Sequence, residues 1–473
     1  MAVASSSASF PNPGLFTNMR CSLSASLSSP PHQARIFMNQ YSRGFRFLHA
    51  ALFTGAIATT ATFSSLSSDW NRSVLAAFDD SPKTVLDQAW QIVNQKYVDP
   101  NFNQVDWQAT RINLLNAEYS STDQAYAALR EALGELGDRY TRFLDPDQYL
   151  ALSNQTAGEL SGVGMRLKVD EVENRISVVE PMENSPAMLA GIESGDVILE
   201  IDGQSTDNMR VEQAAQLIRG EVGTQIKLRI SRSGTEDFEV TLTRARIALP
   251  AVHYSLQEEG STKVGYIRLK EFSSHAAEQM QRAIYDLEEQ NVEAFVLDLR
   301  GNPGGLLYAS IDIAKMWLNE GDIVHTVDRN GFSDDYRARG KALTSLPMAV
   351  LVDNNSASAS EILAGALQDN GRATIIGGQT FGKALVQSVH KLSDGSGLAV
   401  TIAHYYTPNG TDISQRGITP DIELDMNSAE QLRAYSNRSL LGTKQDPCYL
   451  EALSNLQAQI QPQPFAVQDS MVQ

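Results

Sequence analysis

Cysteine is almost absent from this sequence, with two residues in 473, which excludes a fold held together by internal disulfides. Cys21 lies in an N-terminal segment of unusual composition and Cys448 lies near the C-terminus, so the mature chain keeps no pair. The five histidines beyond residue 76 are scattered and show none of the spacings of metal ligands. The sequence therefore predicts neither a metal site nor another cofactor.

Acidic residues and lysine are both missing from the first 68 residues, which contain four arginines and many serines. This is the composition of an organelle transit peptide. An apolar run from Phe47 to Phe63 follows, and the small residues Val74 and Ala76 then suit a signal-peptidase site. We interpret residues 1–76 as a transit peptide plus a lumenal targeting signal, which predicts residence in the thylakoid lumen of a plastid.

Two alternatives to this address remain open at the level of sequence. One is secretion. The other is that Phe47 to Phe63 stays as a membrane anchor, although the run is shorter than the ~20 apolar residues that a span needs.

Removal of residues 1–76 leaves 33 basic and 55 acidic residues, a net charge near −22. Such a surface disfavours nucleic acid and anionic lipid as partners. The full length is enough for about three domains.

The first two segments of the mature chain differ in pattern. Residues 77–156 carry apolar residues at helical spacing, with Thr122 as a predicted N-cap, and we interpret them as a helical domain that packs but does no chemistry. Residues 157–247 consist of short β-like runs with turn residues between them and two short helices. This pattern predicts a small β domain.

Strands and helices alternate in residues 248–425, which predicts an α/β domain with a largely parallel sheet. Residues 426–473 form a polar tail whose best helix candidate is "PCYLEALSNLQAQI". We expect no functional site in this tail.

Within the α/β domain, "LDLRGNPGG" places Gly301, Gly304 and Gly305 directly after a strand. Such glycines let backbone amides approach a ligand, but they also occur in plain strand-to-helix turns. A second loop, "DNNSASASE", places Ser356, Ser358 and Ser360 at the start of a helix. These serines either cap and pack the helix, or one of them is a nucleophile beside amides that stabilise an oxyanion.

A serine nucleophile needs a base, and Lys383 is the candidate in "GGQTFGKALVQ". The lysine sits in a turn between two apolar strands, where burial favours the neutral amine that can accept a proton. The alternative is an exposed charge in a loop.

Together, "SASASEILAGALQDNGRA", "TFGKALVQ", "LDLRGNPGG" and "TPNGTDISQRGITPDI" closely resemble the motifs of the C-terminal processing peptidases, or tail-specific proteases, over about Ser81 to Leu424. The resemblance implies a multidomain fold: an N-terminal helical domain, a PDZ-like β domain and a ClpP/crotonase-like α/β serine peptidase core. It also implies the catalytic residues, which are Ser358 as nucleophile, Lys383 as general base and Gln387 as the residue that orients the lysine. The amides of Gly304 and Ala359 would form the oxyanion hole.

The chain departs from the family after the lysine, where Ala384 stands in place of the usual glycine. If that position required positive φ, alanine would cost stability or misplace Lys383. The resemblance further identifies residues 157–247 as a PDZ domain, with a substrate carboxylate bound by Gly162, Val163, Gly164 and Met165. Backbone amides in such a loop capture a terminal carboxylate while the next strand pairs with the peptide.

The function that the resemblance implies is a serine endopeptidase that binds a protein C-terminus and removes a C-terminal extension by a Ser/Lys dyad. Its implied substrate is the photosystem II reaction-centre precursor. The expected partner is therefore a protein with a free C-terminal tail, and the protease is expected to contact the membrane only through a membrane-embedded substrate. A catalytically silent PDZ-containing binding protein of the same fold is the alternative. A crotonase-type acyl-CoA enzyme is a third reading, against which the PDZ segment argues.

Overall fold

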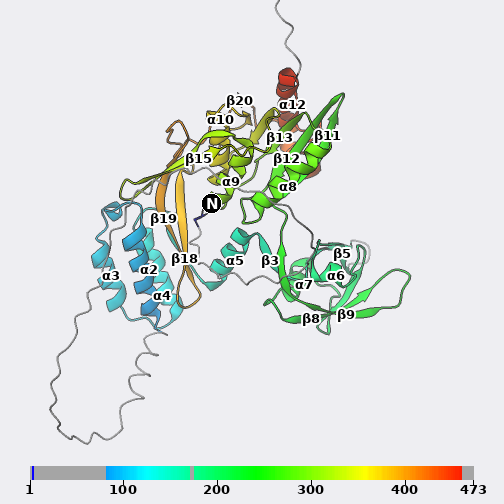
Figure 1. Ribbon diagram of the computed structural model, residues 1–473. Coiled ribbons are helices and arrows are strands. Elements are labelled where there is room, and N and C mark those ends of the chain that lie inside the picture. The colour runs from blue at the N-terminus through cyan, green and yellow to red at the C-terminus, as the bar shows by residue number, and fades with distance from the viewer. Residues whose placement is uncertain (1–2, 5–80, 171–174, 461–473) are drawn as a thin grey trace, which may run out of the picture. The chain divides into compact units, whose positions relative to one another are not determined.

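The computed structural model describes residues 3–4, 81–170 and 175–460 (Figure 1). Apart from the short strand β1 (Val3–Ala4), the predicted transit peptide and lumenal signal lie outside the described residues, as does the apolar run Phe47 to Phe63. No helix in the described part of the chain has both the length and the apolar character needed to cross a membrane.

The first described segment is helical, as the apolar spacing predicts (Figure 1). Its core contains the stacked indoles of Trp90 and Trp107, whose ring centroids are 6.5 Å apart. Each indole N–H donates to the backbone carbonyl of the other tryptophan, so no polar atom of the pair is left unsatisfied. The segment consists of α2 (Pro82–Lys96), η1 (Phe102–Gln104), α3 (Trp107–Asn116), α4 (Thr122–Gly134), β2 (Arg142–Leu144) and α5 (Pro146–Ala157).

The predicted N-cap of α4 is wrong by one residue. Ser121 is the cap, with extended backbone angles, and its hydroxyl accepts a hydrogen bond of 3.2 Å from the Gln124 N–H, while Thr122 is the first helical residue. Serine and threonine both cap well, and only the backbone angles choose between neighbours.

The second segment is a small twisted sheet with its own buried cluster. Strand β8 shows why these residues form a half-buried sheet, since its side chains alternate between exposed and buried along "QIKLRIS". The strand order is β4-β5-β6-β8-β9, so β4 lies at an edge, with β7 beside β6. The elements are β4 (Met165–Asp170), β5 (Arg175–Pro181), α6 (Pro186–Leu189), β6 (Val197–Ile201), β7 (Gln204–Ser205), α7 (Val211–Ile218), β8 (Gln225–Ser231) and β9 (Phe238–Thr243).

The chain enters this sheet through β3 (Glu159–Gly162) and leaves it through β10 (Ala245–Ala248). These two strands pair with each other in an antiparallel ladder. The segment boundaries at 157, 248 and 426 stay predictions.

The third segment contains the predicted parallel sheet, in the order β11-β12-β13-β16-β17-β20. All neighbours in it are parallel except β11 and β12, which form a hairpin. Both faces are buried: Leu297 and Val350 face one apolar cluster, and Val296 and Leu351 face another. The strands are β11 (Val252–Glu259), β12 (Thr262–Leu269), β13 (Ala294–Asp298), β16 (Met348–Val352), β17 (Thr374–Gly377) and β20 (Ile422–Glu423).

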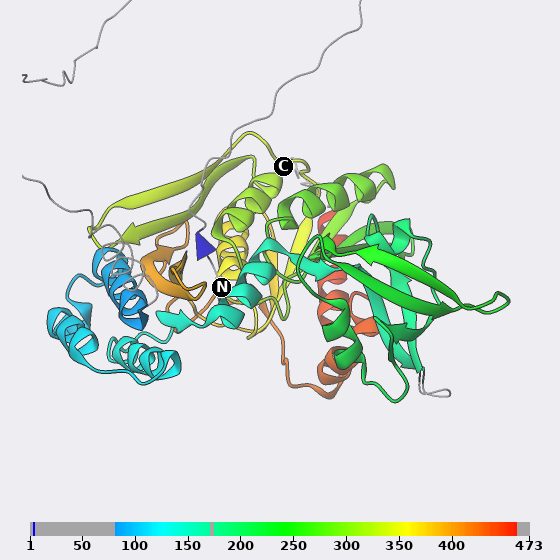
Figure 2. The ribbon, with the colours of Figure 1, turned by 90° about the horizontal axis from the view of Figure 1, so that it is seen from below.

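Helices cover the two faces of this sheet. On one side lie α8 (Ala276–Glu289), α9 (Leu307–Trp317) and α10 (Ala359–Asp369), with α9 and α10 side by side (Figure 2). On the other side packs α12 (Pro447–Ile460), the helix predicted in the tail. Burial on both faces explains the continuous apolar runs of β13 and β16.

A second sheet was not expected from the sequence, which predicted only a largely parallel one. It consists of β18 (Leu385–Lys391), β19 (Gly397–Tyr406), β14 (Glu320–Asp328) and β15 (Ser333–Arg339) in antiparallel order, with β2 beside β19 and β1 parallel to β18 (Figure 1). Strand β15 is mostly exposed and rich in charge, so its sequence lacks the apolar run by which buried strands are recognised. This sheet positions the strand that follows Lys383.

Candidate active site

Ser358 stands at the sharp turn between β16 and α10. Its backbone has φ +57° and ψ −112°, a conformation that residues with a side chain rarely adopt, and the residue is fully buried. Strained backbone of this kind clusters at functional sites, where the surrounding structure holds it. The position at the N-terminus of α10 also places the serine in the positive field of the helix dipole.

The flanking serines connect the turn to the glycine-rich loop. Ser356 Oγ donates to the Leu299 carbonyl over 2.9 Å, and Ser360 Oγ donates to the Asn302 carbonyl over 2.9 Å. Neither hydroxyl caps the helix. The small side chains of the two serines let the loops approach each other, and their hydroxyls hold the loops together.

Lys383 lies in the turn between β17 and β18 and is 6 % exposed. Its Nζ donates to Gln387 Oε1 over 2.7 Å, and lies 4.4 Å from the centre of the Tyr140 ring. Burial is the main cause that lowers the pKa of the Lys383 ammonium from 10.5 to about 8; Arg142 lowers it further and Asp138 opposes the shift. The alternative of an exposed loop charge is wrong.

Glu361 joins the serine turn to the lysine turn, and sequence reasoning missed it. Its fully buried carboxylate accepts hydrogen bonds from the Ser358 N–H (2.7 Å) and the Lys383 N–H (3.0 Å) through Oε2. Through Oε1 it accepts from Thr380 Oγ1 (2.6 Å) and the Gly382 N–H (2.7 Å). A signal was present, since a glutamate three residues after a serine is the pattern of a helix N-terminus whose carboxylate reaches back.

In the backbone around Lys383, the position that requires glycine is the one before the lysine. Gly382 has φ +85°, and a β-carbon there would lie 2.7 Å from the Arg416 backbone nitrogen. Ala384 is buried and does not take a positive φ, so an alanine fits at this position without backbone strain. The departure from the family pattern at Ala384 therefore does not displace the lysine.

The two backbone N–H groups predicted for the oxyanion hole differ in their hydrogen bonding. Ala359 is the first residue of α10, where an N–H has no acceptor within the helix. The Gly304 N–H, by contrast, donates to Asn302 Oδ1 over 2.9 Å. That bond must break before Gly304 can bind a substrate oxygen, and the backbone of Gly304, at φ +100°, has the freedom of glycine to turn.

A pocket of about 690 Å³ opens beside Lys383. Its walls come from the loop that follows α4, which contributes Asp138, Arg139 and Tyr140, and from the strands around Thr401. The interpretation of the helical segment as packing without chemistry is therefore incomplete, because its 137–140 loop touches the lysine. Hydrophobic periodicity reports helices and says nothing about what the loops between them touch.

The predicted carboxylate-binding loop joins β3 to β4. Gly164 has φ +75°, and a β-carbon there would lie 2.3 Å from Cβ of Ser185. Its carbonyl accepts from the Met182 N–H and Ser185 Oγ, both over 2.9 Å, while Val163 is fully buried. Because β4 begins at Met165 and lies at the sheet edge, its outer side offers backbone groups for an added strand. Its binding role stays a prediction.

Comparison with known proteins identifies the family of the chain. The model of peptidase family S41 matches residues 263–424, a PDZ-domain model matches 177–232, and the tricorn protease C1 domain model matches 78–113. The carboxyl-terminal-processing protease of Picosynechococcus sp. is 47 % identical over 346 residues, which cover 73 % of this chain and 83 % of that protein. The chain belongs to the carboxyl-terminal-processing protease family.

Plant relatives of this family are also similar to the chain. The chloroplastic carboxyl-terminal-processing peptidase 3 of Arabidopsis thaliana is 38 % identical, covering 78 % of this chain and 75 % of that protein. A solved structure of a photosystem II D1 C-terminal processing protease is 37 % identical and covers 73 % of this chain and 93 % of that chain, with a TM-score of 0.46. Chloroplastic relatives at 35–40 % identity indicate a plastid location, and two cyanobacterial relatives have higher identities of 47 % and 44 %.

These matches confirm the predicted family and fold class, with a helical N-terminal part, a PDZ domain and a serine peptidase core. The protein is a C-terminal processing serine peptidase that acts on protein substrates. Membership decides against the crotonase-type reading and favours the enzyme over the silent binding protein.

Proposed function

We propose that this protease removes C-terminal extensions from proteins of the thylakoid lumen, with Ser358 as nucleophile and Lys383 as general base. The observation that carries the dyad is Glu361, whose Oε2 accepts from both the Ser358 N–H and the Lys383 N–H. One buried carboxylate thus fixes the backbone of the nucleophile relative to that of the base. The hydroxyl of Tyr405 adds a second link, since it contacts the carbonyl oxygens of the same two residues.

The first half of the reaction forms an acyl-enzyme. The neutral Lys383 amine takes the proton of the Ser358 hydroxyl as Oγ attacks the scissile carbonyl carbon. The Ala359 N–H, and the Gly304 N–H once it leaves Asn302, stabilise the negative oxygen of the tetrahedral intermediate. The Lys383 ammonium then gives its proton to the leaving amine, which is the new N-terminus of the released tail.

In the second half, the Lys383 amine takes a proton from water as the water attacks the ester carbon, and it returns that proton to Ser358 Oγ as the ester C–O bond breaks. Gln387 keeps the amine in place through its 2.7 Å contact. Because Tyr140 and the pocket wall limit the water around Nζ, the amine stays less solvated than a surface lysine, which favours its neutral form.

For the substrate we propose the photosystem II reaction-centre precursor. The two-part N-terminal address supports a lumenal location, and the chloroplastic relatives support the plastid. The acidic mature chain suits a protein partner better than anionic lipid, so the membrane is met through the embedded substrate.

The test is to incubate the mature chain with the purified precursor and to measure intact masses over time. We expect a single shortened protein, and a released tail whose mass accounts for the difference. The Ser358→Ala variant, incubated in parallel, should leave the precursor intact. Degradation at many internal bonds, or an unchanged precursor, would contradict the proposed function.

The PDZ loop leads to a prediction about the substrate terminus. Converting the C-terminal carboxylate of a tail peptide to an amide removes the charge that amides of the Gly162 to Met165 loop would receive. A charge-assisted hydrogen bond is worth about 1.5–3 kcal/mol, so kcat/KM should fall by about 10- to 100-fold. Competing cleavage of the acid and amide peptides in one tube measures the ratio directly.

Gly164→Ala supplies the variant for this comparison, since its β-carbon would collide with Ser185 and deform the loop. It should slow cleavage of the acid peptide and leave the amide peptide unchanged, so the acid-to-amide ratio approaches one. Equal cleavage of the two peptides by the unaltered protease would leave the loop without the proposed role.

A further inference from the structure

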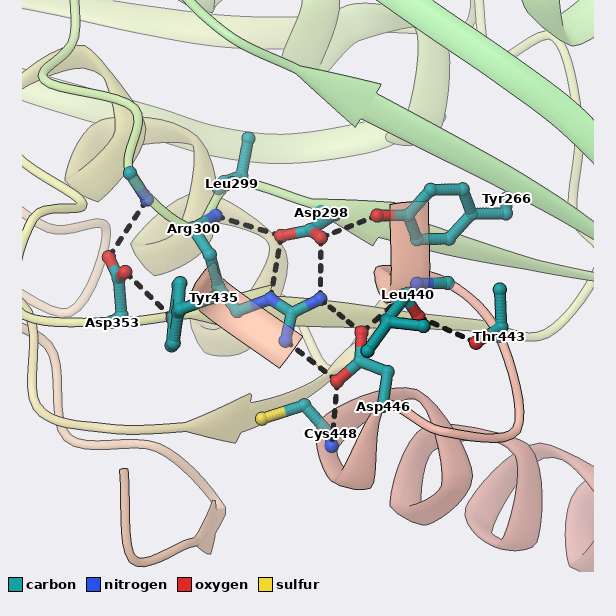
Figure 3. Close-up of polar contacts among 12 residues, drawn as sticks. Tyr266, Asp298, Leu299, Arg300, Asp353, Tyr435, Leu440, Thr443, Asp446 and Cys448 are labelled. Carbon is teal, nitrogen blue, oxygen red and sulfur yellow. Dashed lines mark hydrogen bonds and ion pairs between the residues drawn. The ribbon is translucent and has the colours of Figure 1, made fainter. Parts of the chain in front are cut away.

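The C-terminal segment reaches the two loops that carry the proposed active site. It contains α11 (Ala429–Ser436), η2 (Arg438–Leu440) and α12, and Figure 3 shows Tyr435 of α11 and Asp446, which directly precedes α12, beside residues of those loops. The sequence analysis expected no site in this tail. Its contacts are polar and buried, which distinguishes them from simple packing.

Asp446 fastens the segment to the start of the glycine-rich loop. Both of its carboxylate oxygens accept from the Arg300 guanidinium, over 2.9 and 2.6 Å, and the same guanidinium donates to both oxygens of Asp298, over 2.9 and 2.6 Å (Figure 3). All three side chains are fully buried. Removing one partner of such a group would leave an uncompensated buried charge, so the segment is firmly held.

Asp353 lies at the junction of the glycine-rich loop and the serine turn. Its Oδ1 accepts from the Gly301 N–H and from the Asn355 N–H, each over 3.0 Å, and lies 3.1 Å from Ser356 Oγ. Its Oδ2 accepts from the Tyr435 hydroxyl over 2.8 Å (Figure 3). One oxygen thus serves the two loops, while the other is held by the tail.

The two oxygens of the Asp353 carboxylate affect the spacing of the two loops. Gly301 lies three residues before Gly304, and Asp353 lies five residues before Ser358. Together with the hydrogen bonds of Ser356 and Ser360, Oδ1 therefore helps to set the distance between the oxyanion loop and the nucleophile turn. A carboxylate rotates about its terminal bond unless both oxygens are engaged. The Tyr435 hydroxyl restricts that rotation and keeps Oδ1 directed at the loops.

From these contacts we infer that Tyr435 is a positioning residue for acyl transfer, acting through Asp353 on the spacing between Gly304 and Ser358. The inference rests on the proposed roles of these two residues. Within the C-terminal segment, α11 then helps to position the proposed active site, whereas α12 covers one face of the sheet. The hydroxyl of Tyr435 contacts Asp353 and its ring lies against the Arg300 guanidinium, so we expect its loss to change kcat rather than KM.

The test compares Tyr435→Phe with Tyr449→Phe. Both changes remove one hydroxyl from the same segment, and both hydroxyls contact a carboxylate, but Tyr449 contacts Glu259 at 3.4 Å, at the far end of β11. Each full-length mature variant is assayed for kcat and KM with a tail peptide, for its pH profile, for its melting temperature, and for the second-order rate of labelling by a serine-directed fluorophosphonate.

We expect Tyr435→Phe to lower kcat and the labelling rate together by about tenfold, because small misplacements of reacting groups carry large costs. KM and the midpoint of the pH profile should stay as in the unaltered protease. Tyr449→Phe should retain near-full kcat, with a similar change in melting temperature. Equal labelling rates for the two variants, or a loss that follows only the folded fraction, would overturn the inference.

The same assay of Ser358→Ala separates this inference from the proposed function. If Ser358→Ala still cleaves the tail peptide, the proposed nucleophile is wrong; if Ser358→Ala is inactive and Tyr435→Phe behaves as the control, only the positioning role is wrong. Asp353→Ala gives a second route, since it removes both the acceptor of the Gly301 N–H and the acceptor of the Tyr435 hydroxyl. It should show the same joint loss of kcat and labelling.

Discussion

Ser358→Ala is expected to abolish cleavage while the protein stays folded. The change removes the attacking oxygen and keeps a side chain of nearly the same size in a buried turn, so packing and the strained backbone at φ +57° are preserved. Loss of a nucleophile lowers kcat by about 10⁴-fold or more, and the remaining rate reflects binding and oxyanion stabilisation alone. Mass spectrometry of the precursor measures cleavage, and thermal unfolding measures the fold.

Ser360→Ala and Ser356→Ala are the matched controls, because both are buried serines of the same turn. Ser360→Ala loses one hydrogen bond to the Asn302 carbonyl, and Ser356→Ala loses contacts to Leu299 and Asp353. We expect each to lower the free energy of unfolding by about 1–3 kcal/mol and to retain measurable cleavage. A dead Ser356→Ala variant beside an active Ser358→Ala variant would show that the wrong serine was chosen.

The sequence alone was sufficient to identify the family, because it contains short motifs of unusual composition. Ser358 and Lys383 stand in stretches where small residues and glycines exceed what a plain turn needs. The buried amine followed from apolar strands on both sides of Lys383. The structure agrees, with the lysine 6 % exposed and seated on Gln387.

Contacts between distant parts of the chain could not be predicted in this way. Tyr435 and Asp353 are 82 residues apart, and nothing in either local pattern indicates that they meet. Tyr140 reaches Lys383 from a loop of the helical segment, where periodicity reports only the flanking helices. Such contacts depend on the packing of whole segments, which a single sequence does not display.

The hydrogen-bond acceptor of the Gly304 N–H could not be predicted either, because it depends on the orientation of a single peptide group. The loop "GNPGG" predicts that unusual backbone angles occur, but not which acceptor the N–H finds. In the structure that acceptor is Asn302 Oδ1. The antiparallel sheet around β15 was missed for yet another reason, because its exposed, charged strand carries no apolar run.

Lys383→Arg is expected to be as inactive as Ser358→Ala, although the positive charge is retained. A guanidinium does not release its proton in the accessible pH range, so it cannot act as the base. Its planar fork is also larger than an ammonium in a site already occupied by Gln387 and the Tyr140 ring. Because the Gly162 to Met165 loop is unchanged, the variant should still bind the tail peptide, which competition against the unaltered protease will show.

The pH profile of the unaltered protease tests the same base without any substitution. Burial disfavours the charged amine and lowers its pKa to about 8, so the neutral form gains population as pH rises through that value. The logarithm of kcat/KM should therefore rise with slope one below pH 8 and level off above it. Arg142→Gln removes a charge that helps to lower this pKa, so the limb should move to higher pH. A profile that levels off near pH 6.5, unmoved by Arg142→Gln, would point to a histidine base and exclude the Ser358/Lys383 dyad.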